Sequence, residues 1–371
     1  ATIPSVLAKL ALGLLLLSPP TATGDGRLAV IVVPTVPNLE AEAGQLQGAL
    51  EDGLGRNRVV ARWGELVGVD PASAQALQRL RSLIDLSYKA VSATVSPGEG
   101  SRADEAVAAL GPAAAAATTQ DVQKAYAALA ATRWCNNLPN DAENSAGLSL
   151  AIDPGFAAPP VTSPPGFDDL WERSRFAARD RARTSMDIAS DPPGSRVLVD
   201  GTPRGFSPTS IQGLSQGAHL VQVERVGYSL GGTVVAVTGV GAMQSIHLNP
   251  APGFRPLDVI SAAQYAQRGM AGPAASIAQR YGVSYLVIGV LSPKPNGASL
   301  LLLTAVSSTS AKPLGSHTVS FEGDEYGTAG NTAANAASEL LEGKVQSSKS
   351  EETSKSHSGD PLDNQDGTED W

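Results

Sequence analysis

One short motif in the chain has the spacing of a catalytic nucleophile. Residues Gly213 to Gly217 read G-x-S-x-G, in which Ser215 takes the place of the reactive serine of many hydrolases. That arrangement needs a strand before the serine, a helix after it, and acid and histidine partners. Here the residues before Ser215 are irregular, and those after it alternate in polarity as a strand does. A serine hydrolase using Ser215 is therefore a remote alternative, and no residue is assigned a catalytic role.

The histidines and the single cysteine are not arranged to bind a metal ion. No histidine pair has metal-ligand spacing beside a cysteine or a carboxylate cluster. His219 shares a strand face with Val221 and Val223, which predicts a half-buried histidine with hydrogen-bond partners. Cys135 can form no internal disulfide, so we expect a buried, inert thiol, and no cofactor or metal. The four histidines are His219, His247, His317 and His357.

Three arginines recur at helical spacing in a segment expected to be a helix from Phe167 to Arg183. Arg175, Arg179 and Arg183 are four residues apart, so on a helix they would share one face. Such a stripe could bind an anionic glycan or a phosphate. The favoured interpretation is a solvated helix face, partly paired with Glu172 and Asp180, because charged stripes ordinarily face water.

Composition predicts a mostly folded protein that does not bind nucleic acid. The chain has 371 residues, 42% of them hydrophobic, which is enough for two or three domains. Its net charge of −9 argues against nucleic acid or an anionic membrane as partner, since both need clustered cations. Residues 344–371 carry three lysines and seven acidic residues with few apolar ones, so we expect a disordered acidic tail.

The first residues have the pattern of an export signal. Lys9 precedes an apolar run from Leu10 to Leu17, which a proline pair ends, and Ala22 to Gly24 are small residues suited to a cleavage site. The run is shorter than the roughly 20 apolar residues that span a bilayer. We therefore expect a signal peptide over residues 1–24, a location in the periplasm or outside the cell, and no membrane span after cleavage.

Hydrophobic periodicity divides the rest of the chain into an α+β multidomain arrangement. Residues 25–70 read as a βαβ unit, with an apolar strand at Leu28 to Val33. Residues 71–184 are alanine-rich and helical, and are weakly similar to degenerate tetratricopeptide arrays. Residues 251–343 read as a C-terminal α/β unit. Two arrangements stay open: the first and last units share one sheet, or they are separate small domains.

Between these units lies a run of short strands separated by glycine, proline and aspartate corners. The order of its corners resembles the PEGA domain, which implies an antiparallel β-sandwich over residues 185–250. The resemblance also implies a non-catalytic display or binding module of bacterial envelope proteins. The motif residues that carry it are Pro192, Gly194, Asp200, Gly201, Gly205, Pro208, Gly217, His219, Gly227 and Tyr228.

A second resemblance concerns residues 277–289, where a helix leads through Gly282-Val283-Ser284-Tyr285 into a strand. This step is similar to that of envelope proteins that assist curli export or activate penicillin-binding proteins. The preferred hypothesis is a secreted, non-enzymatic envelope scaffold of the myxobacterial PEGA type, which binds an envelope protein or a cell-wall or surface glycan. The alternative is an accessory activator of an envelope enzyme or export machine.

Overall fold

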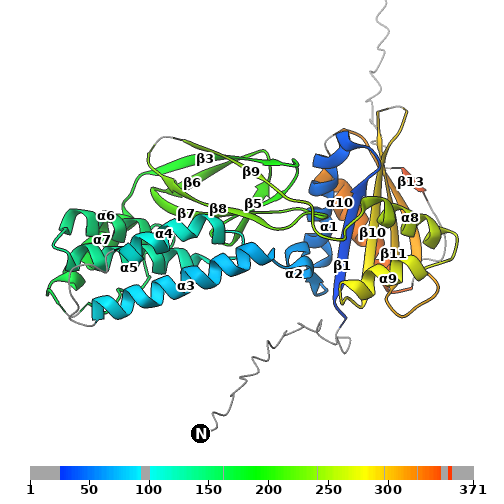
Figure 1. Cartoon of the computed structure of the whole chain (residues 1–371). Helices are drawn as coiled ribbons and strands as arrows, with labels where there is room; N and C mark the ends of the chain where they lie inside the picture. The colour runs from blue at the N-terminus through cyan, green and yellow to red at the C-terminus, as the bar shows by residue number, and fades with distance from the viewer. Residues whose placement is uncertain are drawn as a thin grey trace, which may run out of the picture.

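The computed structural model describes residues 26–92, 101–161, 163–239, 241–295, 297–323, 325–343 and 350–352. The expected signal peptide (1–24) and all but three residues of the expected acidic tail lie outside these ranges. Figure 1 shows an elongated molecule with a sheet unit at one end, from which a helical unit and a β-sandwich extend side by side. Within the described ranges no helix combines the length and apolarity needed to cross a bilayer.

The sheet unit is built from both ends of the chain. Strand β1 (Leu28–Pro34) pairs in parallel with β10 (Tyr285–Pro293), from Leu28 opposite Tyr285 to Pro34 opposite Leu291. The hypothesis of one shared sheet is therefore confirmed. Both strands are apolar almost throughout, as strands buried on both faces require. The sheet order is β13-β12-β11-β10-β1-β2, with β2 (Val60–Ala61), β11 (Ser299–Ser307), β12 (Gly315–Phe321) and β13 (Ser350–Glu352).

Helices cover both faces of this sheet. Helices α1 (Glu40–Leu54) and α10 (Tyr326–Leu341) pack on one face, and α8 (Pro256–Gln267) and α9 (Gly272–Arg280) on the other. Between α1 and α10, small residues let the backbones approach: a Cβ placed on Gly330 would lie 2.2 Å from the Cβ of Ala49. A short 3-10 turn, η1 (Pro37–Leu39), precedes α1, and α2 (Trp63–Val67) follows β2.

The helical unit is alanine-rich, as the sequence predicts. It begins with the hairpin of α3 (Pro71–Ser92) and α4 (Ser101–Ala113), against which α5 (Thr119–Cys135) packs. Thr118 and Asp121 form a reciprocal capping box that starts α5. A helix that the sequence did not indicate, α6 (Pro139–Ser149), is followed by α7 (Phe167–Arg179). Helix α7 ends at Arg179, so its expected extension to Arg183 is wrong.

The middle unit is a two-layer β-sandwich. One layer has the order β5-β4-β7-β8: β5 (Thr202–Phe206), β4 (Arg196–Val199), β7 (Gly217–Glu224) and β8 (Gly231–Val237). The other has the order β6-β3-β9: β6 (Thr209–Ser215), β3 (Arg183–Asp191) and β9 (Ala242–His247). The expectation of a purely antiparallel sandwich is wrong in one pair, because β3 and β9 run parallel. The connection from β8, which ends at Val237, to β9, which begins at Ala242, is short and crosses from one layer to the other.

Candidate functional site

The residues of the PEGA-like motif lie at the corners of the sandwich. Asp200 and Gly201 form the two-residue turn between β4 and β5 with φ of 51° and 75°, the left-handed pair that tight hairpins require. Gly194 and Gly227 lie toward the sheet unit, where they approach Ala41 and Phe254. Gly217 lies at the opposite end, against Ala151 of the helical unit. The motif thus forms the two ends by which the sandwich meets its neighbours.

Helix α1 lies against the sandwich through two glycines one turn apart. A Cβ on Gly44 would lie 1.9 Å from the carbonyl oxygen of Gly194, so only glycine permits this approach. A Cβ on Gly48 would lie 2.0 Å from the ring of Phe206. Because neither position has room for a side chain, the helix backbone itself forms the contact with the first turn of the sandwich.

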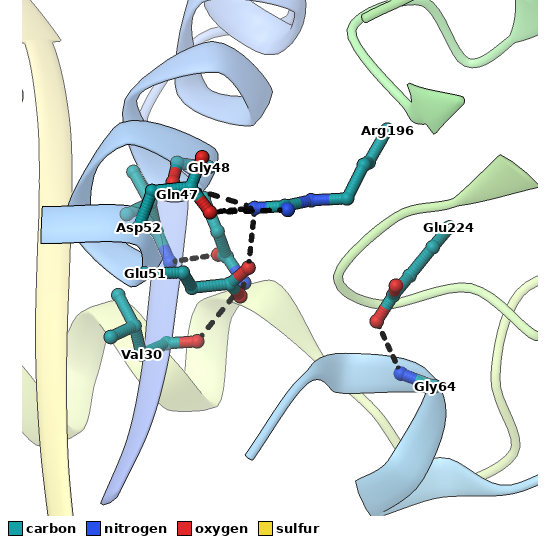
Figure 2. A network of polar contacts seen from close by, with 9 residues as sticks. Val30, Gln47, Gly48, Glu51, Asp52, Gly64, Arg196 and Glu224 are labelled. Carbon is teal, nitrogen blue, oxygen red and sulfur yellow. Dashed lines mark hydrogen bonds and ion pairs between the residues drawn. The ribbon is translucent and has the colours of Figure 1, made fainter. Parts of the chain in front are cut away.

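A buried ion pair spans the same interface (Figure 2). Arg196 of β4 donates from Nη2 to Oε2 of Glu51 on α1 at 2.9 Å, and both side chains are 7% exposed. Arg196 also reaches Asp52 and the carbonyl of Gly48. Burial raises the pKa of Glu51 to about 7, although Arg196 opposes that shift. Burying these two charges costs desolvation free energy, which their mutual attraction and hydrogen bonds must offset.

Gln47 connects this ion pair to strand β1 of the sheet. Its amide nitrogen donates to the carbonyl of Val30 and to Oε1 of Glu51, while its amide oxygen accepts from the main-chain nitrogen of Val32. Figure 2 shows the resulting chain of contacts from β1 through α1 to the sandwich. Because every link is buried, movement of the sandwich on α1 would break hydrogen bonds away from water.

Two further contacts join the sandwich to α2. Glu224 of β7 accepts from the main-chain nitrogen of Gly64 at 2.5 Å, and Trp63 donates from Nε1 to the carbonyl of Tyr228. The space between these groups and the Arg196 pair has a volume of about 20 Å³. That volume holds about one water molecule, so this part of the interface is a structural contact and not a ligand pocket.

A larger cavity lies at the carboxyl end of β1. It has a volume of about 370 Å³ and is bounded by the end of β1, the start of α1, the Gly227-Tyr228 corner and the segment that leads to α8. Arg225 forms part of its wall, is 6% exposed, and donates to the carbonyls of Gly194 and Glu40. Burial lowers the pKa of Arg225, and Glu40 and Glu42 offset this only in part.

The helical unit is joined to the sandwich along the face of β7 and β8 and at the β6–β7 corner. Gln222 of β7 donates to the carbonyls of Ala114, Ala115 and Ala117, which follow α4. Arg181 donates to the carbonyls of Gly147 and Gln216 and so links α6 to the β6–β7 corner. A Cβ on Gly232 would lie 2.7 Å from the backbone of Ala114, so the β7–β8 face also relies on direct backbone contact. The sandwich is therefore fixed between both neighbours.

The residues that could imitate a catalytic triad do not have its geometry. His219 contacts Asp200 at 2.6 Å, but its other ring nitrogen contacts the main-chain oxygen of Ser215. The Ser215 hydroxyl donates to the carbonyl of Ala151 and is buried. Strand β7 follows Ser215, where a nucleophile elbow needs a helix. The Ser215 hydroxyl is not accessible because it is buried, and both ring nitrogens of His219 contact other atoms. These groups hold a corner of the sandwich.

We expect His219 to make stability depend on pH. Burial disfavours its charged form, but the hydrogen bond and charge of Asp200 outweigh this and raise its pKa above 6.5. A raised pKa means that the native state binds the proton more tightly, so the stabilisation is complete below the unfolded pKa and is lost as pH rises through the folded one. The loss of unfolding free energy in His219→Gln, measured by urea titration, should therefore shrink from mildly acidic to mildly alkaline pH. A pH-independent loss would contradict this assignment.

The three candidate anion-binding arginines are not brought together. Arg175 pairs with Glu172 and donates to the carbonyl of Phe156, and the Arg179 guanidinium lies 6.0 Å from the ring centroid of Phe176. Arg183 lies on β3, not on the helix, and donates to the carbonyl of Gly213. The helical stripe is wrong at Arg183 because the chain turns after Arg179. The pairing of Arg175 with Glu172 agrees with the favoured interpretation.

Comparison with known families supports the identity of the sandwich alone. Residues 183–250 match the family model described as the PEGA domain. The chain therefore contains a PEGA domain, and its matched range begins with β3 and ends just after β9. No curated protein matches the chain.

Sequence reasoning missed the interface residues Gly44, Gly48, Glu51 and Arg196. The available signal was the pair of glycines four residues apart inside α1, since a glycine in a helix costs about 1 kcal/mol relative to alanine unless packing requires it. Glu51 carried no signal, because one more acidic residue on an amphipathic helix reads as solvent-exposed.

Proposed function

We propose that the chain is a secreted, non-enzymatic envelope protein in which the PEGA domain rigidly couples a helical binding unit to an α/β unit. The observation that supports this role is the double attachment of the sandwich: the Arg196 contacts join it to the sheet unit, and the Gln222 contacts join it to the helical unit. A domain attached to both neighbouring units in this way transmits the position of one unit to the other and is not a free tether. The partner would be an envelope protein or a cell-wall or surface glycan.

Other features support the remaining parts of the proposal. The N-terminal export pattern favours the periplasm or the cell exterior, as in the myxobacterial PEGA proteins that the chain resembles, and the net charge of −9 disfavours nucleic acid. The geometry at Ser215 favours a structural role for the G-x-S-x-G motif. No cofactor is included in the proposed function.

Two binding assays test the proposed role. Purified full-length chain is sedimented with peptidoglycan sacculi or surface polysaccharide, and in parallel is photocrosslinked in envelope fractions from helical-unit positions. We expect saturable association in one arm, and weaker association for Gly44→Ala, which disturbs the coupling but leaves the helical unit intact. Equal binding by that variant would contradict the coupling role, and binding in neither arm would contradict the scaffold.

The non-enzymatic part has its own test. A fluorophosphonate probe should label neither the native chain nor Ser215→Ala, since the native hydroxyl is buried and donates to Ala151. Labelling that disappears in Ser215→Ala would replace the scaffold proposal by the hydrolase. The export part is tested by fusing residues 1–24 to a phosphatase that is active only outside the cytoplasm.

A second candidate, an accessory activator of an envelope enzyme or export machine, is favoured by the shared sheet. The helix-to-strand step at residues 277–289 resembles that of such proteins, and its strand β10 pairs with β1 of the opening βαβ unit. A crosslink from the α/β unit to an envelope enzyme, with no glycan binding, would favour this candidate over the first.

A further inference from the structure

We infer that the acidic residues 360–371 bind, within the same chain, to the outer face of helix α8. That face and its flanks, the α8 surface, consist of the exposed residues Arg255, Leu257, Tyr265, Arg268 and Met270. The inference does not rest on the proposed scaffold function, because it concerns a contact inside one chain and no external partner.

The α8 surface exposes large apolar side chains that are close together in sequence. Leu257 is 74% exposed, Tyr265 45% and Met270 48%. The main-chain nitrogen of Met270 donates to the carbonyl of Tyr265, which holds these two residues together at the end of α8. The inner face of the helix packs on the sheet through Val259 and Ala262. A group of exposed large apolar side chains, unlike a single one, indicates an interaction surface.

The α8 surface is also basic, although the chain as a whole is acidic. Residues 255–280 contain three arginines and one acidic residue, Asp258, whereas the whole chain has a net charge of −9. Arg255 and Arg268 are exposed, and neither guanidinium has a hydrogen bond or an ion pair with a residue that the structure describes. Cations beside exposed apolar groups favour an acidic ligand that has apolar side chains of its own.

Residues 360–371 have this chemistry. They contain five acidic residues and no lysine or arginine, and their two large apolar residues are Leu362 and Trp371. A tryptophan ring can stack on a guanidinium and contact the thioether of a methionine, and Arg268 and Met270 offer these two groups. The segment therefore matches the α8 surface both in charge and in apolar side chains.

The direction of the last strand brings the segment to the correct end of the sheet. Strand β13 runs parallel to β12 and ends with Glu352 opposite Ser320, so the chain leaves it at the end of the sheet where β1 and β10 also end. Helix α8 begins at that same end, because Pro256 and the last residues of β1 line one cavity.

The chain between β13 and the acidic segment is long enough to reach α8. Helix α8 packs over β10, which is three strands away from β13, or about 14 Å at the usual strand spacing. The seven residues 353–359 can span up to about 25 Å, which also covers the roughly 10 Å between the helix layer and the sheet.

Attachment within one chain makes even a weak contact sufficient. A short linker gives the tethered segment an effective concentration in the millimolar range. Because the segment arrives at the amino end of α8, we expect Leu362 near Leu257 and Trp371 near Tyr265. An acidic partner of the α/β unit would then have to displace the segment before it could bind the α8 surface.

Photocrosslinking in the full chain tests the contact. The photoreactive residue p-benzoylphenylalanine replaces Tyr265 or, as a control, Phe176, which is 68% exposed on α7 in the helical unit. We expect crosslinks from position 265 to residues 360–371, mapped by mass spectrometry, at least about fivefold above those from position 176. Mixing isotopically light and heavy chains separates contacts within a chain from contacts between chains. Equal yields from both positions, no crosslink to the segment, or crosslinks only between chains would overturn the inference.

Charge variants test the basis of the contact. Combining Arg255→Glu with Arg268→Glu should lower the crosslinking yield from position 265 at least about fivefold, because both attractive charges are reversed. Arg204→Glu, at an exposed arginine of β5, should leave the yield unchanged. Asp363→Asn combined with Asp366→Asn should also lower it, without any change in the units that the structure describes. Thermal unfolding verifies that each variant is folded. A yield that is the same before and after charge reversal would overturn the inference.

Discussion

Replacing Arg196 by methionine should lower the free energy of unfolding by about 3–5 kcal/mol, because it leaves the buried carboxylate of Glu51 without its cation. The substitution also removes the contact of the guanidinium with the Phe206 ring, 5.7 Å from its centroid. Urea-induced unfolding near neutral pH measures the loss. The matched control is Arg204→Met, at an exposed arginine of the adjacent strand β5, which should change stability by less than about 0.5 kcal/mol.

The charge of Glu51 gives this prediction two internal checks. Burial already raises its pKa to about 7 against the opposing charge of Arg196, so in Arg196→Met the pKa should rise further and the carboxyl should become neutral at a higher pH. The loss should therefore be smaller in mildly acidic buffer than in alkaline buffer. Adding Glu51→Gln to Arg196→Met should recover part of the loss, since no buried charge remains. Equal losses in Arg196→Met and Arg204→Met would show that the pair contributes nothing.

Replacing Gly44 by alanine should destabilise the protein by about 3 kcal/mol, even though alanine is the better helix former. The new Cβ would lie 1.9 Å from the Gly194 carbonyl oxygen and 2.2 Å from Nη1 of Arg225, so α1 must move away from the PEGA domain. Much of the strain falls on backbone, which cannot swing aside as a side chain can. Thermal and urea unfolding measure the effect.

For a second glycine in a helix, we expect substitution by alanine to change stability in the opposite direction. Gly327 lies in α10, where an added Cβ would meet nothing within 4 Å, so Gly327→Ala should be neutral or stabilising by up to about 1 kcal/mol. Opposite signs at Gly44 and Gly327 would locate the effect in the interface and not in helix propensity. A Gly44→Ala protein as stable as the native one would show that α1 and the PEGA domain do not make this close approach.

Local patterns predicted those parts of the fold whose cause is local. The apolar runs at Leu28 to Val33 and Tyr285 to Leu291 read as strands because both faces are buried. Their joining in one sheet was one of two arrangements that the sequence left open, and the pairing of β1 with β10 decides between them. The Asp200-Gly201 hairpin was readable because positive φ selects these residue types.

The features that the sequence did not predict share a physical cause: their local sequence signals are weak. Strand β3 buries only Met186 and Ile188 among its apolar residues, and the arginines before it have helical spacing, so the boundary between helix and strand was displaced. The parallel pairing of β3 with β9 joins residues some 56 positions apart, as Asp191 and His247 show, and no turn sequence encodes it. The partners Glu51 and Arg196 are 145 residues apart, so neither residue indicates the other.

The pairing of β1 with β10 dictates an order of biogenesis. Its hydrogen-bonded neighbour β10 is made only after the helical unit and the PEGA domain, so an emerging chain displays an apolar segment whose partner does not yet exist. The inserted units can become compact first, whereas the α/β core closes only when the last third of the polypeptide arrives. A nascent chain that stops before residue 285 would lack β10, so one edge of the apolar strand β1 would stay unpaired and prone to aggregation. Such a chain should require a holdase chaperone or be degraded.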